Sequence, residues 1–307
     1  MDAFAATRLA VGAAFLAFAA VSDLRTRKVR DPVWVALGSI GLFLVAAETV
    51  LRPIDPLAWP LIAAAGIWFY AIFFGDPLFD ENGFHARPVR IALLLVAAAL
   101  FLFPAASASA GGPGLSAAVG EIYSLPAMVL VYQGFYRVRL LHGGADTKGL
   151  IALTLLVPSA PSAAPFPLLA VAPPVDAALR IVFPFSLVVW VDAALASLAI
   201  PIGMLVYNAM RGDLRLPQAF LGYRVSLEPF AEHAWLMERI TPGGEHVLVL
   251  FPKRGADPSA DIARLRAAGI ERAWVTPQTP FMVPLFVGFL MAFLVGNLLI
   301  GILGLAR

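Results

Sequence analysis

The sequence predicts an all-α polytopic membrane protein with about eight transmembrane helices and a small cytosolic α/β domain inserted before the last helix. Two observations predict this class. Of the 307 residues, 60% are hydrophobic and 14% are charged, whereas soluble domains average about 25% charged residues. The hydrophobic residues also fall into runs of about 18 residues or more, which is long enough to cross a bilayer.

Seven hydrophobic runs precede a long polar segment and one follows it. We expect spans at 5–22, 33–51, 57–75, 89–107, 121–138, 149–165, 181–209 and 281–304. No small-residue cleavage site follows the first run, so we expect it to be retained as a helix rather than removed as a signal peptide. Pro184 and Pro201 are expected to kink the seventh run. The predicted domains are a transmembrane catalytic domain (1–209), a cytosolic domain (210–279) and a final transmembrane helix (280–307).

The basic residues predict the orientation of the chain. The segments 23–32, 76–90, 137–148 and 210–278 together carry 18 of the 22 Lys and Arg residues. The positive-inside rule makes this side cytoplasmic and places both ends of the chain outside. We therefore expect a multi-pass protein of the plasma membrane.

The polar segment contains the pattern of a small folded domain. Residues 246–251 (HVLVLF) and 271–275 (ERAWV) have the composition of strands, and 258–268 has helical spacing ended by Gly269. The order of strand, helix and strand predicts a βαβ unit.

Composition excludes several classes of function. There are no cysteines and only 4 histidines, none at metal-ligand spacing, so we expect no disulfide framework, no metal site and no cysteine nucleophile. The net charge of +2 does not favour nucleic acid as a partner. The lipid bilayer is the partner that composition predicts, and no cofactor is implied.

Two aspartates are the candidate catalytic residues. Asp23 ends the first hydrophobic run, and Asp146 lies between the fifth and sixth runs. The predicted topology places both on the cytoplasmic side at similar depth, although a carboxylate at a bilayer boundary is costly without a partner or a role. Two carboxylates that share a proton can activate a water and donate to a carbonyl oxygen, which is the chemistry of an aspartic peptidase. Gly143, Gly144 and Ala145 leave room beside Asp146 for another backbone.

The segments around these aspartates resemble a known family. The segment SDLRTRKVRDPVW at 22–34 resembles the first aspartate motif of type IV prepilin peptidases and archaeal preflagellin peptidases. The segment GGADTK at 143–148 resembles their GxGD motif with its DxK extension, and 274–285 is similar to the segment before the last helix in archaeal members with a cytosolic domain. The resemblance implies an aspartic endopeptidase that cuts the short basic leader (class III signal peptide) from archaellin or type IV pilin precursors at the cytoplasmic face.

The resemblance assigns Asp23 and Asp146 as the catalytic pair, with Gly143, Gly144, Ala145 and Lys148 as supporting residues of the motif. Ala145 departs from the family pattern, which has glycine before the aspartate, and a left-handed backbone there would strain an alanine. The chain also has two more predicted helices between the aspartates than simpler archaeal members need. The missing cysteine pairs point to the archaeal branch of the family.

Other interpretations remain open at the level of sequence. Asp23 also fits a helix-end charge before an ordinary stop-transfer cluster, and Lys148 either tunes Asp146 electrostatically or marks the cytoplasmic face. A membrane transporter or assembly scaffold would use Asp23, Asp146 and Asp192, a carboxylate inside the seventh run, for ion coupling or packing. Internal repeats typical of transporters are not evident. A catalytically altered paralogue is a further alternative, for which Ala145 is the one hint.

Overall fold

The computed structural model of the chain describes residues 2–52, 55–76, 78–80, 83–112, 114–141, 143–161, 165–169, 171–241, 243–253 and 257–304. The chain divides into two compact units. The first consists of Met1–Ala194 with Phe281–Arg307, and the second is Leu195–Pro280.

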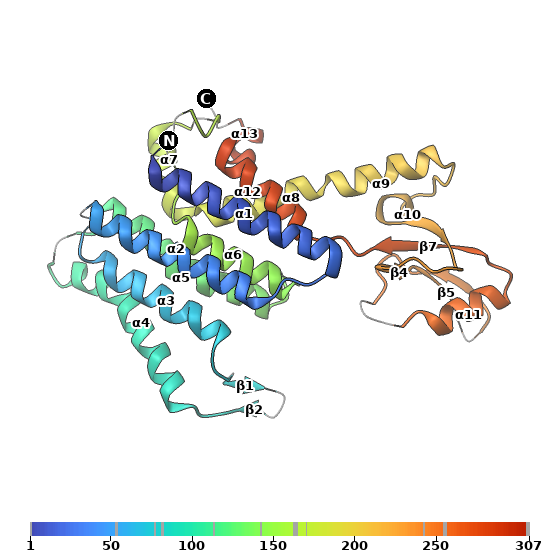
Figure 1. Cartoon of the computed structure of the whole chain (residues 1–307), viewed down its shortest axis with the longest axis horizontal. Coiled ribbons are helices and arrows are strands. Elements are labelled where there is room, and N and C mark those ends of the chain that lie inside the picture. The colour runs from blue at the N-terminus through green and yellow to red at the C-terminus, as the bar shows by residue number, and fades with distance from the viewer. Residues whose placement is uncertain are drawn as a thin grey trace. The chain divides into compact units, whose positions relative to one another are not determined.

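The first unit is a helical bundle (Figure 1). Its helices are α1 (Ala3–Thr26), α2 (Asp31–Leu51), α3 (Ala58–Phe73), α4 (Pro88–Ser109), α5 (Ala117–Arg137), α6 (Gly144–Leu156), α7 (Pro173–Val182), α8 (Phe185–Ser197), α12 (Met282–Leu294) and α13 (Leu298–Ile302). Two short antiparallel strands, β1 (Phe79–Asp80) and β2 (Gly83–Phe84), lie between α3 and α4.

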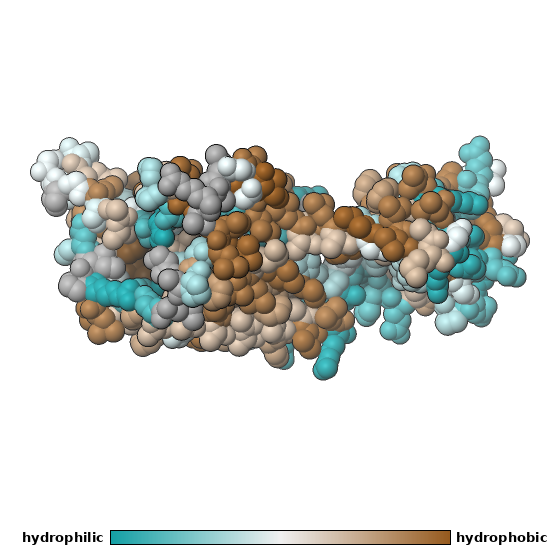
Figure 2. All heavy atoms as spheres, turned by 90° about the horizontal axis from the view of Figure 1, so that it is seen from above, coloured by the Kyte–Doolittle hydropathy of each residue, from teal (hydrophilic) through white to brown (hydrophobic). Residues whose placement is uncertain are grey.

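The structure supports the predicted membrane class but not the predicted number of spans. Among the described residues, four helices are long and apolar enough to cross a bilayer: α1, α2, α4 and the stretch Phe185–Met210. The helices α3 and α12 are apolar but shorter. Hydrophobic side chains cover a broad area of the face shown in Figure 2, and many large ones are exposed, among them Phe43 on α2 and Val89 on α4. A surface of this kind is typical of a protein that faces lipid.

Three predicted spans differ in their boundaries from the observed helices. The sixth run forms a helix only to Leu156, and residues 162–164 of that run lie outside the described part of the chain. The start of the seventh run belongs to α7, because Pro184 disfavours helical backbone in the residue before it and α8 begins only at Phe185. The last run is broken between α12 and α13, where Gly296 has a positive φ of 106° and Asn297 caps α13.

Close backbone contacts at glycines fix how the helices of the first unit pack. A Cβ atom added to Gly41 of α2 would lie 2.5 Å from the backbone nitrogen of Leu156 in α6. A Cβ atom added to Gly288 of α12 would lie 2.5 Å from the backbone nitrogen of Ala193 in α8. Small residues allow such close approach between membrane helices. The helix α6 is consequently held in the interior, and every residue from Gly149 to Leu156 is buried.

The second unit combines helices with two small sheets. Its elements are α9 (Ala199–Met210), α10 (Gln218–Leu221), β3 (Tyr223–Ser226), β4 (Ala234–Leu236), β5 (Glu238–Ile240), β6 (His246–Leu248), α11 (Ser259–Ala267) and β7 (Arg272–Pro277). Strands β3 and β4 flank β7, both antiparallel to it, with Tyr223 opposite Val275 and Trp235 opposite Thr276. Strands β5 and β6 form a separate antiparallel pair.

The structure does not contain the predicted βαβ unit. Its strand, helix and strand are present as β6, α11 and β7, but β6 and β7 do not pair with each other. Both edges of β7 are already occupied by β3 and β4, two short strands whose sequences carry no clear period. The side chains of Ala219, Met237 and Trp274 are packed together in one of the two cores of this unit.

Candidate active site

Asp23 lies in the last turn of α1, next to the start of α12. Its Oδ2 atom accepts a hydrogen bond of 3.3 Å from the backbone N–H of Met282, the first residue of α12. The first N–H groups of a helix have no partner within the helix and carry partial positive charge, so a carboxylate is stabilised there. Helix α1 ends beyond Asp23 because Arg27 takes a left-handed conformation (φ 54°) and donates its N–H to the Asp23 carbonyl.

Asp146 lies in the first turn of α6, and its carboxylate bends back over Gly143. A Cβ atom added to Gly143 would lie 2.1 Å from Oδ2 of Asp146, far closer than any real contact. The space that this glycine leaves is therefore occupied by the carboxylate itself. Gly144 differs, because the nearest neighbour to an added Cβ atom there is the Tyr136 hydroxyl at 3.9 Å.

Ala145, the departure from the family pattern, causes no backbone strain. It lies inside α6 with helical backbone angles and is not among the residues with positive φ. Its methyl group packs against the hydrophobic core of the first unit. An alanine is therefore compatible with the conformation at this position.

The aspartates come from helices that meet at one end of the bundle. Gly149, almost one turn after Asp146, faces both Trp34 of α2 and Leu285 of α12, whose atoms lie 3.2 and 3.5 Å from a Cβ atom added there. Leu285 is one turn along α12 from Met282, which contacts Asp23. Helix α1 also contacts α6 directly. Asp23 thus contacts the first residue of α12, and Gly149, three residues after Asp146, packs against the same helix at Leu285.

Lys148 links α6 to α2 through an ion pair. Its Nζ atom lies 2.6 Å from Oδ1 of Asp31, the first residue of α2, and 5.3 Å from the centre of the Phe73 ring. Sequence reasoning did not assign a role to Asp31. The signal was present, since an acidic residue before Pro32 is typical of the first turn of a helix, where the dipole favours negative charge.

A buried group of hydroxyls also positions α6 and was not predicted. The hydroxyl of Thr154 lies 2.7 Å from that of Ser186 in α8, and Ser186 accepts a hydrogen bond of 3.1 Å from Tyr132 in α5. Buried polar groups need such partners because an unpaired one is costly. These contacts join α5, α6 and α8 in the interior; each helix contributes one residue, so no local sequence motif indicated them.

Asp192 lies away from the two candidate residues. It is fully buried in α8, where Oδ1 accepts a hydrogen bond of 3.2 Å from the N–H of Leu298 at the start of α13. The next residue of α8, Ala193, packs against Gly288 in the middle of α12, since a Cβ atom added to Gly288 would lie 2.5 Å from the Ala193 nitrogen. At 1.5 Å per residue, Gly288 is about 9 Å along α12 from Met282, the residue that contacts Asp23.

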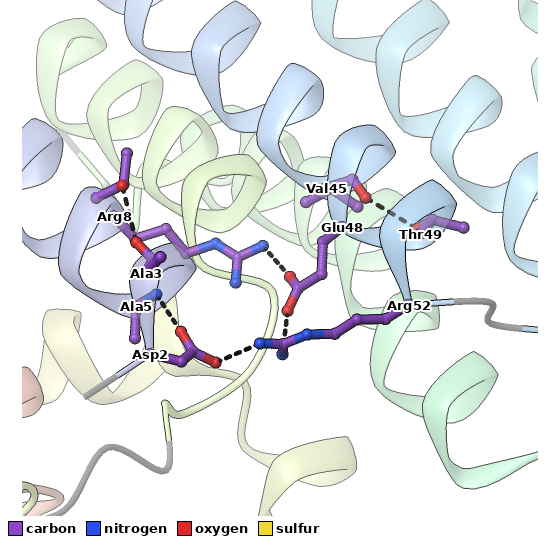
Figure 3. A network of polar contacts seen from close by, with 9 residues as sticks. Asp2, Ala3, Ala5, Arg8, Val45, Glu48, Thr49 and Arg52 are labelled. Atoms are coloured by element: carbon purple, nitrogen blue, oxygen red, sulfur yellow. Dashed lines mark hydrogen bonds and ion pairs between the residues drawn. The ribbon is translucent and has the colours of Figure 1, made fainter.

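The opposite ends of α1 and α2 carry a different charge network (Figure 3). Arg52 lies 2.8 Å from Asp2 and 2.9 Å from Glu48, and Arg8 lies 2.7 Å from the other oxygen of Glu48. The Ala5 backbone N–H, and after it the Arg52 guanidinium, hold the pKa of Asp2 below its usual value of 3.8. This network joins the start of α1 to the end of α2 at the end of the bundle away from Asp23.

Comparison with known proteins finds similarities to archaeal peptidases. Residues 214–298 match the family described as Archaeal Peptidase A24 C-terminus Type II. The chain is also 28% identical over 182 residues to the preflagellin peptidase of Methanocaldococcus jannaschii, an alignment that covers 57% of this chain and 71% of that protein. The match to the family model falls in the C-terminal part of the chain, where the sequence before the last helix carried one of the three resemblances. The chain therefore carries the C-terminal region of archaeal A24 peptidases, is similar to a preflagellin peptidase, and is a peptidase.

Proposed function

We propose that this protein is an aspartic endopeptidase of the plasma membrane that removes the short basic leader from archaellin or type IV pilin precursors at the cytoplasmic face. The observation that supports the proposal is that Asp23 bonds to Met282 of α12 while Gly149, three residues after Asp146, packs against Leu285 of the same helix. The similarity to a preflagellin peptidase supports the class of substrate.

Asp23 and Asp146 act as general base and general acid on one water molecule. Two carboxylates that approach each other closely cannot both ionise, so the pair holds one proton. The ionised member takes a proton from water as the oxygen attacks the peptide carbonyl, and the protonated member donates to the carbonyl oxygen. The tetrahedral diol then collapses, the C–N bond breaks, and the leaving nitrogen takes up a proton from the pair.

The distribution of charge supports a cytoplasmic site. Asp23 immediately precedes four basic residues before α2, at 25, 27, 28 and 30, and Lys148 lies two residues after Asp146. Positive residues that flank transmembrane segments remain preferentially on the cytoplasmic side. A site at this end meets the leader of a precursor before the rest of the precursor crosses the membrane.

The proposal is tested by cleavage of a tagged archaellin or pilin precursor in liposomes that contain the full chain. Wild-type protein and Asp192→Asn are expected to release a leader-sized fragment, since Asp192 is buried in α8 and bonds to the start of α13. Asp23→Asn and Asp146→Asn are expected to lower the rate by about a thousandfold or more, as for residues that act as one catalytic unit.

Two outcomes would count against the proposal. Cleavage that survives either substitution would mean that another residue supplies the acid or the base. A wild-type protein that cuts none of several precursors would favour the transporter or scaffold interpretation.

A further inference from the structure

A cavity of about 470 Å³ lies between α3, α4, α5 and α6. Apolar side chains of three helices form its walls, among them Trp68 of α3, Leu94 of α4 and Leu130 of α5. The cavity reaches Gly144, Thr147 and Lys148, the residues around Asp146 in the first turns of α6. A volume of a few hundred Å³ is typical of a site that takes a ligand or a peptide segment.

The cavity exists because α4 and α5 meet only toward one end. There the rings of Phe101 and Tyr123 lie 5.5 Å apart, and the Tyr123 hydroxyl accepts a hydrogen bond of 3.0 Å from the N–H of Ala105. Closer to the start of α4 and the end of α5 the cavity separates the two helices. The only buried residues of α4 within the described chain are Ala97 and Pro104, so this helix is covered on one side by α3 and otherwise open.

The charges at the cavity distinguish between the two parts of a precursor. Arg90, Arg137 and Lys148 line the same cavity as its apolar residues. Arg90 donates to the carbonyls of Ala71 and Phe74 and is fixed in place at the end of α3. Like charges repel most strongly where water is excluded. A basic leader is therefore disfavoured in this cavity, whereas an apolar helix matches its walls.

We propose that this cavity, between α4 and α5, is the docking site for the apolar helix that follows the scissile bond of a precursor. The helix enters from the lipid through the separation of α4 and α5. Its first residues then lie against Gly144, where no side chain blocks a second backbone, and the leader extends away from the three basic residues. This inference rests on the proposed function, because it assigns the binding site for the same substrate.

Photo-cross-linking tests the inference independently of cleavage. A photo-reactive amino acid replaces Leu94 or Leu130 in the cavity, or the neighbouring Leu95, which is 65% exposed on α4, in full-length protein carrying Asp146→Asn to slow cleavage. Adducts from positions 94 and 130 are expected in the apolar helix of the precursor, and position 95 is expected to label lipid. Equal labelling from positions 94 and 95, labelling of lipid alone from the cavity, or adducts in the leader would overturn the proposal.

Filling the cavity gives a second test. Leu94→Trp is expected to raise KM for a full-length precursor and lower kcat/KM by about tenfold, the effect of a loss of 1.4 kcal/mol in binding, with kcat unchanged. The matched variant Leu95→Trp is expected to keep the wild-type KM and kcat/KM. If both tryptophan variants behave as wild type, the docking site is elsewhere although the peptidase function stands. If wild-type protein neither cuts nor cross-links the precursor, the proposed function fails as well.

Discussion

Gly143 sets the position of the Asp146 carboxylate. Its missing side chain leaves the volume in which Oδ2 of Asp146 lies, and a methyl group there would come within 2.1 Å of that oxygen. Its φ of −95° is open to any residue, so the requirement for glycine is a matter of space and not of backbone strain. Gly134 of α5 has no such requirement, because nothing lies within 4 Å of a Cβ atom added there.

Gly143→Ala is therefore expected to displace the Asp146 carboxylate and lower kcat by about a hundredfold, the usual effect of an ångström-scale misplacement at an active site. The matched variant Gly134→Ala is expected to remain within about twofold of wild type, as substitutions without a steric conflict do. The measurement is kcat for cleavage of a precursor by each variant. Similar kinetics for both variants would show that Asp146 does not depend on the space at Gly143.

Among the elements, α2 and α6 make the contact that places the Asp146 turn. Gly41 lets the α2 backbone approach that of α6 at Leu155 and Leu156, and Gly149 does the same against Trp34 nearer the site. Close packing of this kind gains dispersion energy over many atoms. The ion pair of Lys148 with Asp31 joins the same two helices near their N-terminal ends.

Gly41→Ala places a methyl group 2.5 Å from the backbone nitrogen of Leu156 and must push α2 and α6 apart. We expect a loss of about 1–3 kcal/mol in the free energy of unfolding, as for other overpacked interiors, together with lower peptidase activity. Gly66→Ala is the control, since the nearest atom lies at 3.6 Å in ordinary contact. Denaturation in detergent measures both variants, and equal stability would contradict the close packing of α2 on α6.

The sequence predicted where helices lie better than it predicted where they break and which strands pair. The hydrophobic runs predicted α1 and α2 closely, because long apolar segments report burial in lipid directly. The break at Gly296 was missed because the apolar composition continues through it. The pairing of β7 with β3 and β4 was missed because strands of three or four residues are too short to show a period.

The candidate site was accessible to sequence reasoning only in part. Motif resemblance pointed to Asp23 and Asp146; the structure shows Asp23 bonded to Met282 of α12, and Gly149 of α6 packed against Leu285 of that helix. The contact of Asp23 with the Met282 N–H and the pair of Lys148 with Asp31 join residues 259 and 117 positions apart in the chain. Contacts of this separation depend on tertiary packing, and no local pattern encodes them.

At the scale of the whole molecule, the first unit has a separate group of charged residues at each end of α1 and α2. The Asp23 end holds the candidate site, and the other end holds Asp2, Arg8, Glu48 and Arg52 in contact with one another. Arg8 and Glu48 are mostly buried, with 11% and 19% of their side chains exposed. Breaking a buried pair leaves an uncompensated charge, so this network stabilises the arrangement of α1 on α2.

The lowered pKa of Asp2 predicts a dependence of stability on pH. Because its folded-state pKa lies below 3.8, the contribution of Asp2 to stability is present above that pH and is lost as the pH falls through the lower folded-state value. With 43% of its side chain exposed, solvent screening limits the contribution to about 0.5 kcal/mol. Asp2→Asn is therefore expected to lower thermal stability slightly at pH 7 and to match wild type in strong acid. A difference in stability that persists at the lowest pH would contradict this account.

The most direct test of the account asks whether positions 23 and 146 meet. The chain has no cysteine, so Asp23→Cys combined with Asp146→Cys introduces a unique pair of thiols that a short bifunctional maleimide can join. The matched control combines Asp23→Cys with Asp192→Cys, because Asp23 bonds to the start of α12 whereas Asp192 is buried in α8 and bonds to the start of α13. Mass spectrometry of digested protein, with and without bound precursor, identifies the linked peptides. We expect a cross-link between positions 23 and 146 and none between 23 and 192; failure of the first pair to cross-link under either condition would contradict a shared catalytic site.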